Sequence, residues 1–241
     1  MITLTAKESN DFLARYVPVA KNVIVKNVNE ATGFSKAFPV VLKLVSKSYT
    51  HKSDIGGVKI VHTEEALRRE YAKLAKLARK VNGKILIQEF IPGREIIIGL
   101  KRDKTFGFVI MLGTGGVGVE LLKDVSFRVC PITEQDVNQM ISDLRMKELL
   151  YGIRGEKPIN FALLKSVVLR VSRLSERYPE IRELDINPFI INDKIGKVVD
   201  ARAVLNKKVK RIRSKPTPII KMGSKHIRTL LKRLSLFSSY N

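Results

Sequence analysis

The chain has 241 residues, with 45 Lys and Arg against 23 Asp and Glu, so its formal net charge at pH 7 is +22. A hydrophobic content of 44% favours a folded protein over a disordered polycation. One cysteine, Cys130, excludes a disulfide framework and a cysteine-rich metal cluster, and it is typical of a reducing cytoplasm.

No uninterrupted apolar run approaches the ~20 residues that a membrane span requires. The first residues also lack the basic-then-apolar pattern of a signal peptide. We therefore expect a cytoplasmic protein without a transmembrane segment, and the charge predicts an anionic partner such as a nucleic acid, a phosphorylated ligand or a membrane surface.

Strand-length apolar runs alternate with helical periodicities along the chain. Helices are predicted from Thr63 to Gly83, from a capping box at Thr133 and Asp136, and over 160–178. Strands are predicted over 38–45, 56–61, 85–90, 95–100, 106–112, 126–129, 183–191 and 197–204. Strands that are interrupted by single helices and joined by short links indicate a mixed α/β or α+β architecture.

Charge divides the chain at residue 206. The segment 207–241 contains 11 Lys and Arg and no acid, so it carries +11 of the total of +22. Within it Ile227, Leu230, Leu231 and Leu234 recur at helical spacing among basic residues, which predicts a basic amphipathic helix. We therefore expect one domain over 1–206 and a basic, partly helical tail over 207–241.

Two lysines and a histidine are the first candidates for phosphate chemistry. Lys43 lies in an apolar strand, where alternation allows either an exposed strand face or contact with an anion. Lys59 follows on the next strand as a possible second cation. Between them His51 precedes Lys52 and Asp54, and a neutral imidazole can carry a phosphoryl group covalently. The alternative for His51 is an ordinary histidine in a surface loop.

The glycine cluster Gly113-x-Gly115-x-x-Gly118 matches the dinucleotide-binding fingerprint in spacing. That fingerprint also requires a helix at its third glycine and an acid about 20 residues further on. Residues 119–129 instead predict an extended segment, so the dinucleotide interpretation fails. A glycine turn near phosphates and an ordinary tight hairpin both remain open.

Oxygen ligands gather near the end of the domain. Asp185 and Asn187 are two residues apart on a predicted strand, so their side chains share one face. If the last strand folds back, Asp200 joins them, and two carboxylates with an amide oxygen form a set that suits Mg²⁺. A polar strand face is the alternative. Glu89 and Glu95 are further acids at strand edges, where they are either functional or simply solvated.

The order of these segments resembles one protein family. Blocks at 38–43, 51–59, 93–99, 122–128 and 183–188 are similar to those of the β subunit of ADP-forming acetyl-CoA synthetase (acetate–CoA ligase), in the succinyl-CoA synthetase superfamily. The resemblance implies a two-lobed ATP-grasp fold over about 5–205. By this matching the small lobe spans about 20–88, and the large lobe spans about 89–206 together with the N-terminal segment.

The same resemblance implies roles for individual residues. His51 would relay a phosphoryl group from a partner phosphohistidine to ADP, and Lys43 would contact nucleotide phosphates. Gln88, Glu89 and Phe90 would form the hinge near adenine, and Glu95 would be a further nucleotide contact. Asn187 and Asp200, helped by Asp185, would hold Mg²⁺.

The resemblance further implies an acid–thiol ligase that uses ATP or ADP and Mg²⁺ and works with a CoA-binding α subunit in an α2β2 assembly. Because a CoA-binding domain is not recognised in this sequence, we expect the chain to need that partner for the complete reaction. The segment before Phe38 is shorter than in the family, and the basic tail matches nothing in it. Two alternatives therefore remain: a related succinyl-type ligase subunit, and a non-catalytic relative that binds nucleic acid or anionic surfaces through its tail.

Overall fold

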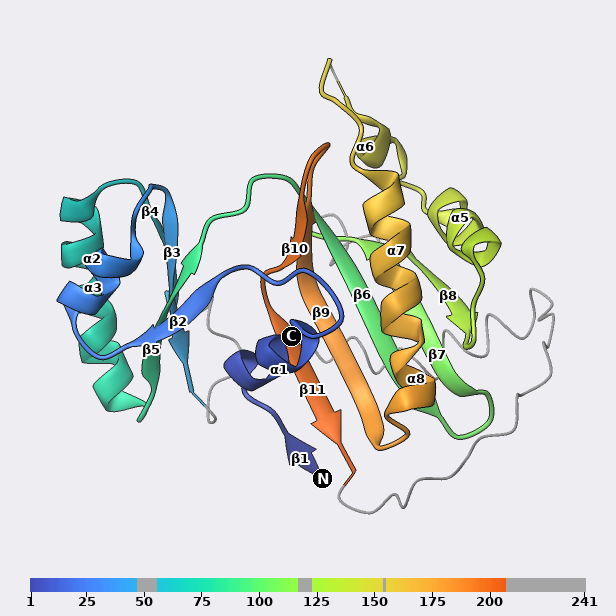
Figure 1. Cartoon of the computed structure of the whole chain (residues 1–241), viewed down its shortest axis with the longest axis horizontal. Helices are drawn as coiled ribbons and strands as arrows, with labels where there is room; N and C mark the ends of the chain where they lie inside the picture. Colours follow the sequence, from blue (N-terminus) through green and yellow to red (C-terminus); the bar gives the residue numbers. More distant parts are fainter. Residues whose placement is uncertain (47–55, 117–122, 154, 207–241) are drawn as a thin grey trace. The chain divides into compact units, whose positions relative to one another are not determined.

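The computed structural model describes residues 1–46, 56–116, 123–153 and 155–206. These residues form two sheets whose strand pairings are all antiparallel, a four-stranded sheet B and a seven-stranded sheet A (Figure 1). Both kinds of element occur in them, which confirms the predicted mixed architecture. The tail 207–241, with its predicted helix, lies outside the described residues.

Sheet B has the strand order β2-β5-β3-β4, formed by Asn22–Val25, Lys84–Glu89, Val40–Val45 and Val58–Val61. Two helices, α2 (Val28–Phe34) and α3 (Glu64–Lys80), cover one of its faces. Leu42, Leu44 and Ile87 point into the core beneath these helices and are fully buried. Alternate residues on the same strands therefore point to the other face.

The predicted start and end of α3 are confirmed. The Thr63 side chain accepts a hydrogen bond from the Ala66 N–H at 3.1 Å, which satisfies one of the amides at the helix start. At the other end Asn82 adopts a positive φ of 47°, and the Gly83 N–H donates to the carbonyl of Ala78 at 2.8 Å. These two bonds explain why a polar threonine and an Asn-Gly pair bracket the helix.

Sheet A has the strand order β1-β11-β9-β6-β7-β8, and β10 pairs with β9 beside this path. Its strands are Ile2–Thr3 (β1), Arg94–Asp103 (β6), Gly107–Thr114 (β7), Val125–Val129 (β8), Ile181–Ile191 (β9), Gly196–Val198 (β10) and Ala201–Leu205 (β11). The central strand β9 comes from the last quarter of the domain and pairs with β6, which lies about 90 residues earlier. The periodicity of a local segment predicts a strand but not which distant strand it pairs with.

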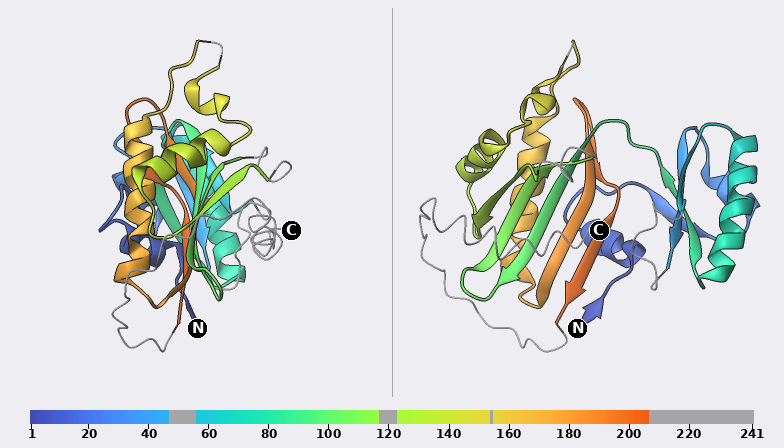
Figure 2. Two further views of the ribbon diagram at one scale, coloured as in Figure 1. Left: turned by 90° about the vertical axis from the view of Figure 1, so that its right-hand side faces the viewer. Right: turned by 180° about the vertical axis from the view of Figure 1, so that it is seen from behind.

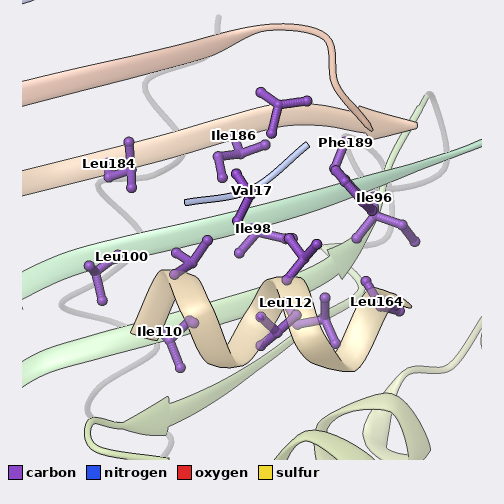
Figure 3. Close-up of a cluster of buried hydrophobic side chains, with 14 of the residues drawn as sticks. Val17, Ile96, Ile98, Leu100, Ile110, Leu112, Leu164, Leu184, Ile186 and Phe189 are labelled. Carbon is purple, nitrogen blue, oxygen red and sulfur yellow. The ribbon is translucent and has the colours of Figure 1, made fainter. Parts of the chain in front are cut away.

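Helices α1 (Ala6–Leu13), α5 (Glu134–Asp143) and α7 (Phe161–Ser172) contribute to one core on a single face of sheet A (Figure 2). Two short helices, α6 (Glu148–Tyr151) and α8 (Leu174–Arg177), flank α7. Figure 3 shows how Ile98 and Leu100 of β6 meet Ile186 of β9 and Leu164 of α7 in this core. Asp185 alternates with Leu184 and Ile186 and so belongs to the opposite face, whereas Asn187 is exposed at the point where the register of β9 with β6 shifts.

Several predicted elements need correction. The helix predicted over 160–178 is divided at Arg173 into α7 and α8, and the last strand is divided at Val199 and Asp200 into β10 and β11. The sequence reading also omitted α1 and α2, although Thr5 and Glu8 form a capping box that has the same chemistry as the predicted one at Thr133. Among the described residues, none of the helices combines the length and the apolar character that a membrane crossing demands.

Candidate functional site

Lys43 and Gln88 converge on one backbone carbonyl. The Lys43 Nζ atom donates to the carbonyl oxygen of Val199 at 3.0 Å, and the Gln88 Nε2 atom donates to the same oxygen at 3.0 Å. The antiparallel register of β3 and β5 places both side chains on the face of sheet B that α2 and α3 do not cover. Asp200, a predicted metal ligand, follows Val199 directly.

The interpretation of Lys43 as an exposed strand residue is wrong. All six positions of β3 are buried, and the Lys43 side chain is 7% exposed. The physical reason is the bond to Val199: a carbonyl from 156 residues further along the chain supplies the partner that a buried ammonium requires. Alternation predicted the strand face of Lys43 correctly, but what covers that face comes from a remote segment.

Lys59 does not join Lys43. In the register of β3 and β4, Lys59 lies opposite Leu42, whereas Lys43 lies opposite Val58. Directly paired residues of an antiparallel ladder project to the same face, so Lys59 belongs to the face of Leu42 and Lys43 to the other. The structure therefore separates two cations that the sequence reading grouped together.

The predicted hinge residues lie at the end of β5 and just beyond it. Gln88 is fully buried, and within the described part of the chain its Oε1 atom has no hydrogen-bond partner. Glu89 is half-buried, and its Oε1 atom accepts from the Lys21 N–H at 2.6 Å and from Lys197 Nζ at 2.7 Å. Phe90, which is also half-buried, follows β5 in the link to β6.

Glu95 is exposed and lies on β6 beside the glycine cluster. The Gly115 N–H donates to the Glu95 carbonyl at 2.6 Å, and a Cβ atom added to Gly115 would lie 2.5 Å from the Glu95 Cβ atom. Only glycine permits this approach. Since β7 and β8 pair antiparallel on either side of the cluster, the rejection of a parallel dinucleotide-binding unit is confirmed.

The predicted metal ligands come from neighbouring segments of sheet A. The Asn187 N–H donates to the Asp200 carbonyl at 3.0 Å, so the two residues are adjacent. Asp185 is 6% exposed and is paired with Gly99 of β6 on one side and with Arg202 of β11 on the other. In the described ranges no three side chains drawn from His, Cys, Asp and Glu group as metal ligands. The predicted ligands are the carboxylates of Asp185 and Asp200 and the amide oxygen of Asn187. A set that contains only oxygen atoms fits Mg²⁺.

Three further residues could take part in chemistry, and the structure explains two of them, Cys130 and Asp124. His51 lies outside the described residues. Burial raises the pKa of the Cys130 thiol to about 12, so it stays protonated near neutral pH and does not act as a thiolate nucleophile. Asp124 is buried and accepts hydrogen bonds from the Thr114 hydroxyl and from the N–H groups of Arg145 and Met146, which fixes the end of β7.

Sequence reasoning missed two contributors to this region. The Val199 carbonyl is a backbone atom, so no residue-type signal marks it. Lys197 pairs with Glu89 at 2.7 Å and connects β10 to the end of β5. Because Lys197 and Glu89 are 108 residues apart in the sequence, no local pattern predicts that they pair.

Comparison with known proteins agrees with this arrangement of sheets and polar groups. The model of the ATP-grasp domain family matches residues 2–205. The β subunit of acetate–CoA ligase [ADP-forming] I from Pyrococcus furiosus is 40% identical over 84% of this chain and 91% of its own length. A 4-hydroxybutyrate–CoA ligase [ADP-forming] from Nitrosopumilus maritimus is 40% identical over 79% of this chain, which corresponds to 29% of that longer protein.

A solved structure of acetyl-coenzyme A synthetase 1 from Ca. Korarchaeum cryptofilum has a TM-score of 0.74 at 42% identity, covering 85% of this chain and 93% of that one. It is described as a complex with coenzyme A and Mg-AMPPCP, with a phosphohistidine segment pointing towards the nucleotide-binding site. The present chain has a mixed α/β ATP-grasp fold and belongs to the family of ADP-forming acetate–CoA ligases, which are acid–thiol ligases.

Proposed function

We propose that this chain is the nucleotide-binding subunit of an ADP-forming acyl-CoA synthetase and that it transfers a phosphoryl group to Mg-ADP. The observation that carries the proposal is the convergence of Lys43 and Gln88 at Val199, next to Asp200. It supports the proposal because a cation and a buried amide of sheet B lie close to Asp200, a predicted ligand in the link between β10 and β11. Family membership supports the same activity.

The adenine end of the nucleotide lies at the end of β5 in this proposal. The Gln88 Oε1 atom is buried and lacks a donor among the described residues, and such an acceptor is costly unless it is satisfied. The exocyclic amino group of adenine supplies a donor of the required kind. Glu89 and Phe90 form the adjoining hinge, and Glu95 contacts the nucleotide from β6.

At the phosphate end, Lys43 neutralises charge that spreads over the phosphoryl oxygens during transfer. Asn187 and Asp200, with Asp185 as a helper, would hold Mg²⁺, which supplies further charge neutralisation and orients the phosphates. We assign no phosphate contact to Lys59, because its strand register directs it to the helix-covered face.

His51 acts as the phosphoryl relay in this proposal. A ring nitrogen of neutral His51 attacks the phosphorus of a phosphohistidine on the partner, so that one N–P bond forms as the other breaks. A terminal phosphate oxygen of ADP then attacks the same phosphorus. This step forms the new P–O bond of ATP and releases His51 in its original state.

The CoA-binding partner supplies the remaining chemistry. We propose an α2β2 assembly in the cytoplasm, in which the α subunit converts acyl-CoA and orthophosphate into free acid, CoA and its own phosphohistidine. Relatives named for acetate and for 4-hydroxybutyrate share 40% identity with this chain. This range of acids supports a partner-determined choice of acyl group, with a succinyl-type ligase as the alternative.

The test is reconstitution of the chain with its native CoA-binding partner, followed by an assay of ADP phosphorylation with a panel of acyl-CoA thioesters. His51→Asn should lower the rate by at least about a thousandfold, because it removes the covalent carrier. His62→Asn is the matched control, since His62 is exposed at the end of β4, and it should retain the wild-type rate. Full activity of His51→Asn would refute the relay.

A second candidate function rests on the tail alone. The segment 207–241 carries half of the net charge, which supports binding to nucleic acid or to an anionic surface in addition to catalysis. Removal of the residues after Leu205 should lower the salt concentration at which the chain elutes from heparin, because half of the net charge is lost, and should leave Mg-ADP binding intact. Undiminished retention would show that the tail is not the polyanion-binding element.

A further inference from the structure

A pocket lined by arginines lies between the turn that follows α1 and the helices α7 and α8. Its volume is about 590 Å³, and guanidinium groups of Arg15, Arg170, Arg173 and Arg177 line it. Because these helices cover the core face of sheet A, the pocket belongs to the side of the sheet away from Asp185. It therefore has no part in the nucleotide site proposed above.

The charge of the pocket is strongly unbalanced. Four arginines face a single acid, Glu176, among the lining residues. Within the described residues, none of the four forms an ion pair with a carboxylate. Arg170, Arg173 and Arg177 follow one another at three- and four-residue spacing, which puts like charges on one helical face and disfavours the fold. A bound anion would remove this cost.

Contacts with Phe12 of α1 and with Tyr16 of the following turn hold three of the guanidinium groups in position. Arg170 Nη1 donates to the Tyr16 carbonyl at 3.2 Å, and Arg15 Nε donates to the Phe12 carbonyl at 3.4 Å. The Arg177 guanidinium lies over the Tyr16 ring, 5.6 Å from its centroid. The Tyr16 hydroxyl is in turn hydrogen-bonded to that of Tyr178. Such preorganisation lowers the entropy lost on binding.

We propose that this arginine pocket binds a small phosphorylated anion that carries at least two negative charges. Guanidinium groups bind phosphate oxygens through paired N–H donors, and the volume is within the range of small-molecule sites. All four arginines are exposed, so a ligand reaches them directly from solvent. The pocket gives the chain a second phosphate-binding site, beyond its proposed catalytic function.

Titration of the full chain with inorganic tripolyphosphate tests the proposal by calorimetry at fixed ionic strength. The pocket variant Arg173→Gln/Arg177→Gln should bind at least about tenfold more weakly than wild type, because two charged hydrogen-bond donors are lost. The matched control is Arg69→Gln/Arg79→Gln, which removes the same charge from exposed positions of α3. The affinity of this control should stay within about twofold of wild type. Both variants retain the basic tail, so any binding of tripolyphosphate to the tail is the same in the two titrations.

Equal titrations of the pocket variant and the control would overturn the proposal. Arg173→Gln alone provides a second test that preserves the contacts of Arg177 with Tyr16, and it should weaken binding at least about threefold. A poly-glutamate peptide serves as the competing probe. If this peptide binds more tightly than tripolyphosphate and depends on the same arginines, the pocket is a docking surface for an acidic protein and the small-ligand proposal is wrong.

Discussion

The two faces of sheet B are built from the same strands, and both bury apolar side chains, but only one of them also buries a lysine and a glutamine. One face presents Leu42, Leu44 and Ile87 to the helices α2 and α3. The other presents Lys43 and Gln88, which are also buried but donate hydrogen bonds to the backbone carbonyl of Val199. Burial alone therefore does not distinguish the stabilising face from the face that we assign to chemistry.

The comparison shows that the two faces of a strand can be equally buried and still serve different roles, one in stability and the other in the proposed binding of nucleotide. On the helix-covered face each side chain gains from the removal of apolar surface from water. On the other face Lys43 and the amide nitrogen of Gln88 lose hydration and gain hydrogen bonds to Val199, whereas the Gln88 Oε1 atom has no partner among the described residues. Substitutions on the first face should therefore affect unfolding, and those on the second should affect nucleotide binding.

The largest expected effect is on the helix-covered face. Leu42→Ala should lower the free energy of unfolding by about 2–5 kcal/mol, because it leaves a cavity beneath α3. Ile60→Ala is the control, since Ile60 is 52% exposed on β4, and it should cost less than about 1 kcal/mol. Chemical denaturation followed by circular dichroism measures both values. Equal costs would mean that the helices do not define the stabilising face.

A smaller effect should separate the two lysines. Lys43→Met should weaken Mg-ADP binding at least about tenfold, since it removes a charged donor from the proposed phosphate site. Lys59→Met removes the same charge from the opposite face and should stay within about twofold of wild type. Calorimetric titration with Mg-ADP compares the two variants. A comparable loss for Lys59→Met would restore its sequence-based assignment to the phosphates.

The smallest expected effect concerns the helix that covers the apolar face. Thr63→Ala removes the oxygen that accepts from the Ala66 N–H and should destabilise the fold by about 1 kcal/mol. Thr63→Ser keeps that oxygen and should behave like wild type. Neither change should alter Mg-ADP affinity. Thermal unfolding reads out the difference, and an unchanged midpoint for the alanine variant would contradict the capping role.

Local signals account for the parts of the fold that the sequence predicted correctly. Caps at Thr63 and Thr133 and apolar runs such as 38–45 depend on neighbours within a few residues, so they can be read directly. The order of the sheets depends on contacts such as β6 with β9 and cannot be read this way. Helix α1 has a recognisable capping box, but at eight residues it is too short to show a long apolar periodicity.

In the candidate site, too, local features could be predicted from the sequence and features that depend on long-range contacts could not. Spacing predicted that Asp185 and Asn187 share a face, but the register of β9 with β6 shifts at Asn187, which spacing alone does not show. Residue types did not reveal that Lys59 faces away from Lys43, because this depends on the pairing of β3 with β4. They also did not reveal the acceptor at Val199, because a carbonyl is common to all residues.

That acceptor has a consequence for mutational tolerance. Because Lys43 and Gln88 both donate to a main-chain oxygen, no side-chain substitution at position 199 deletes the group that holds them. Replacement of Val199 by another aliphatic residue should leave the anchor of both donors intact. The anchor is sensitive to the path of the peptide chain between β10 and β11, so insertions or deletions there should be tolerated far less well than point substitutions.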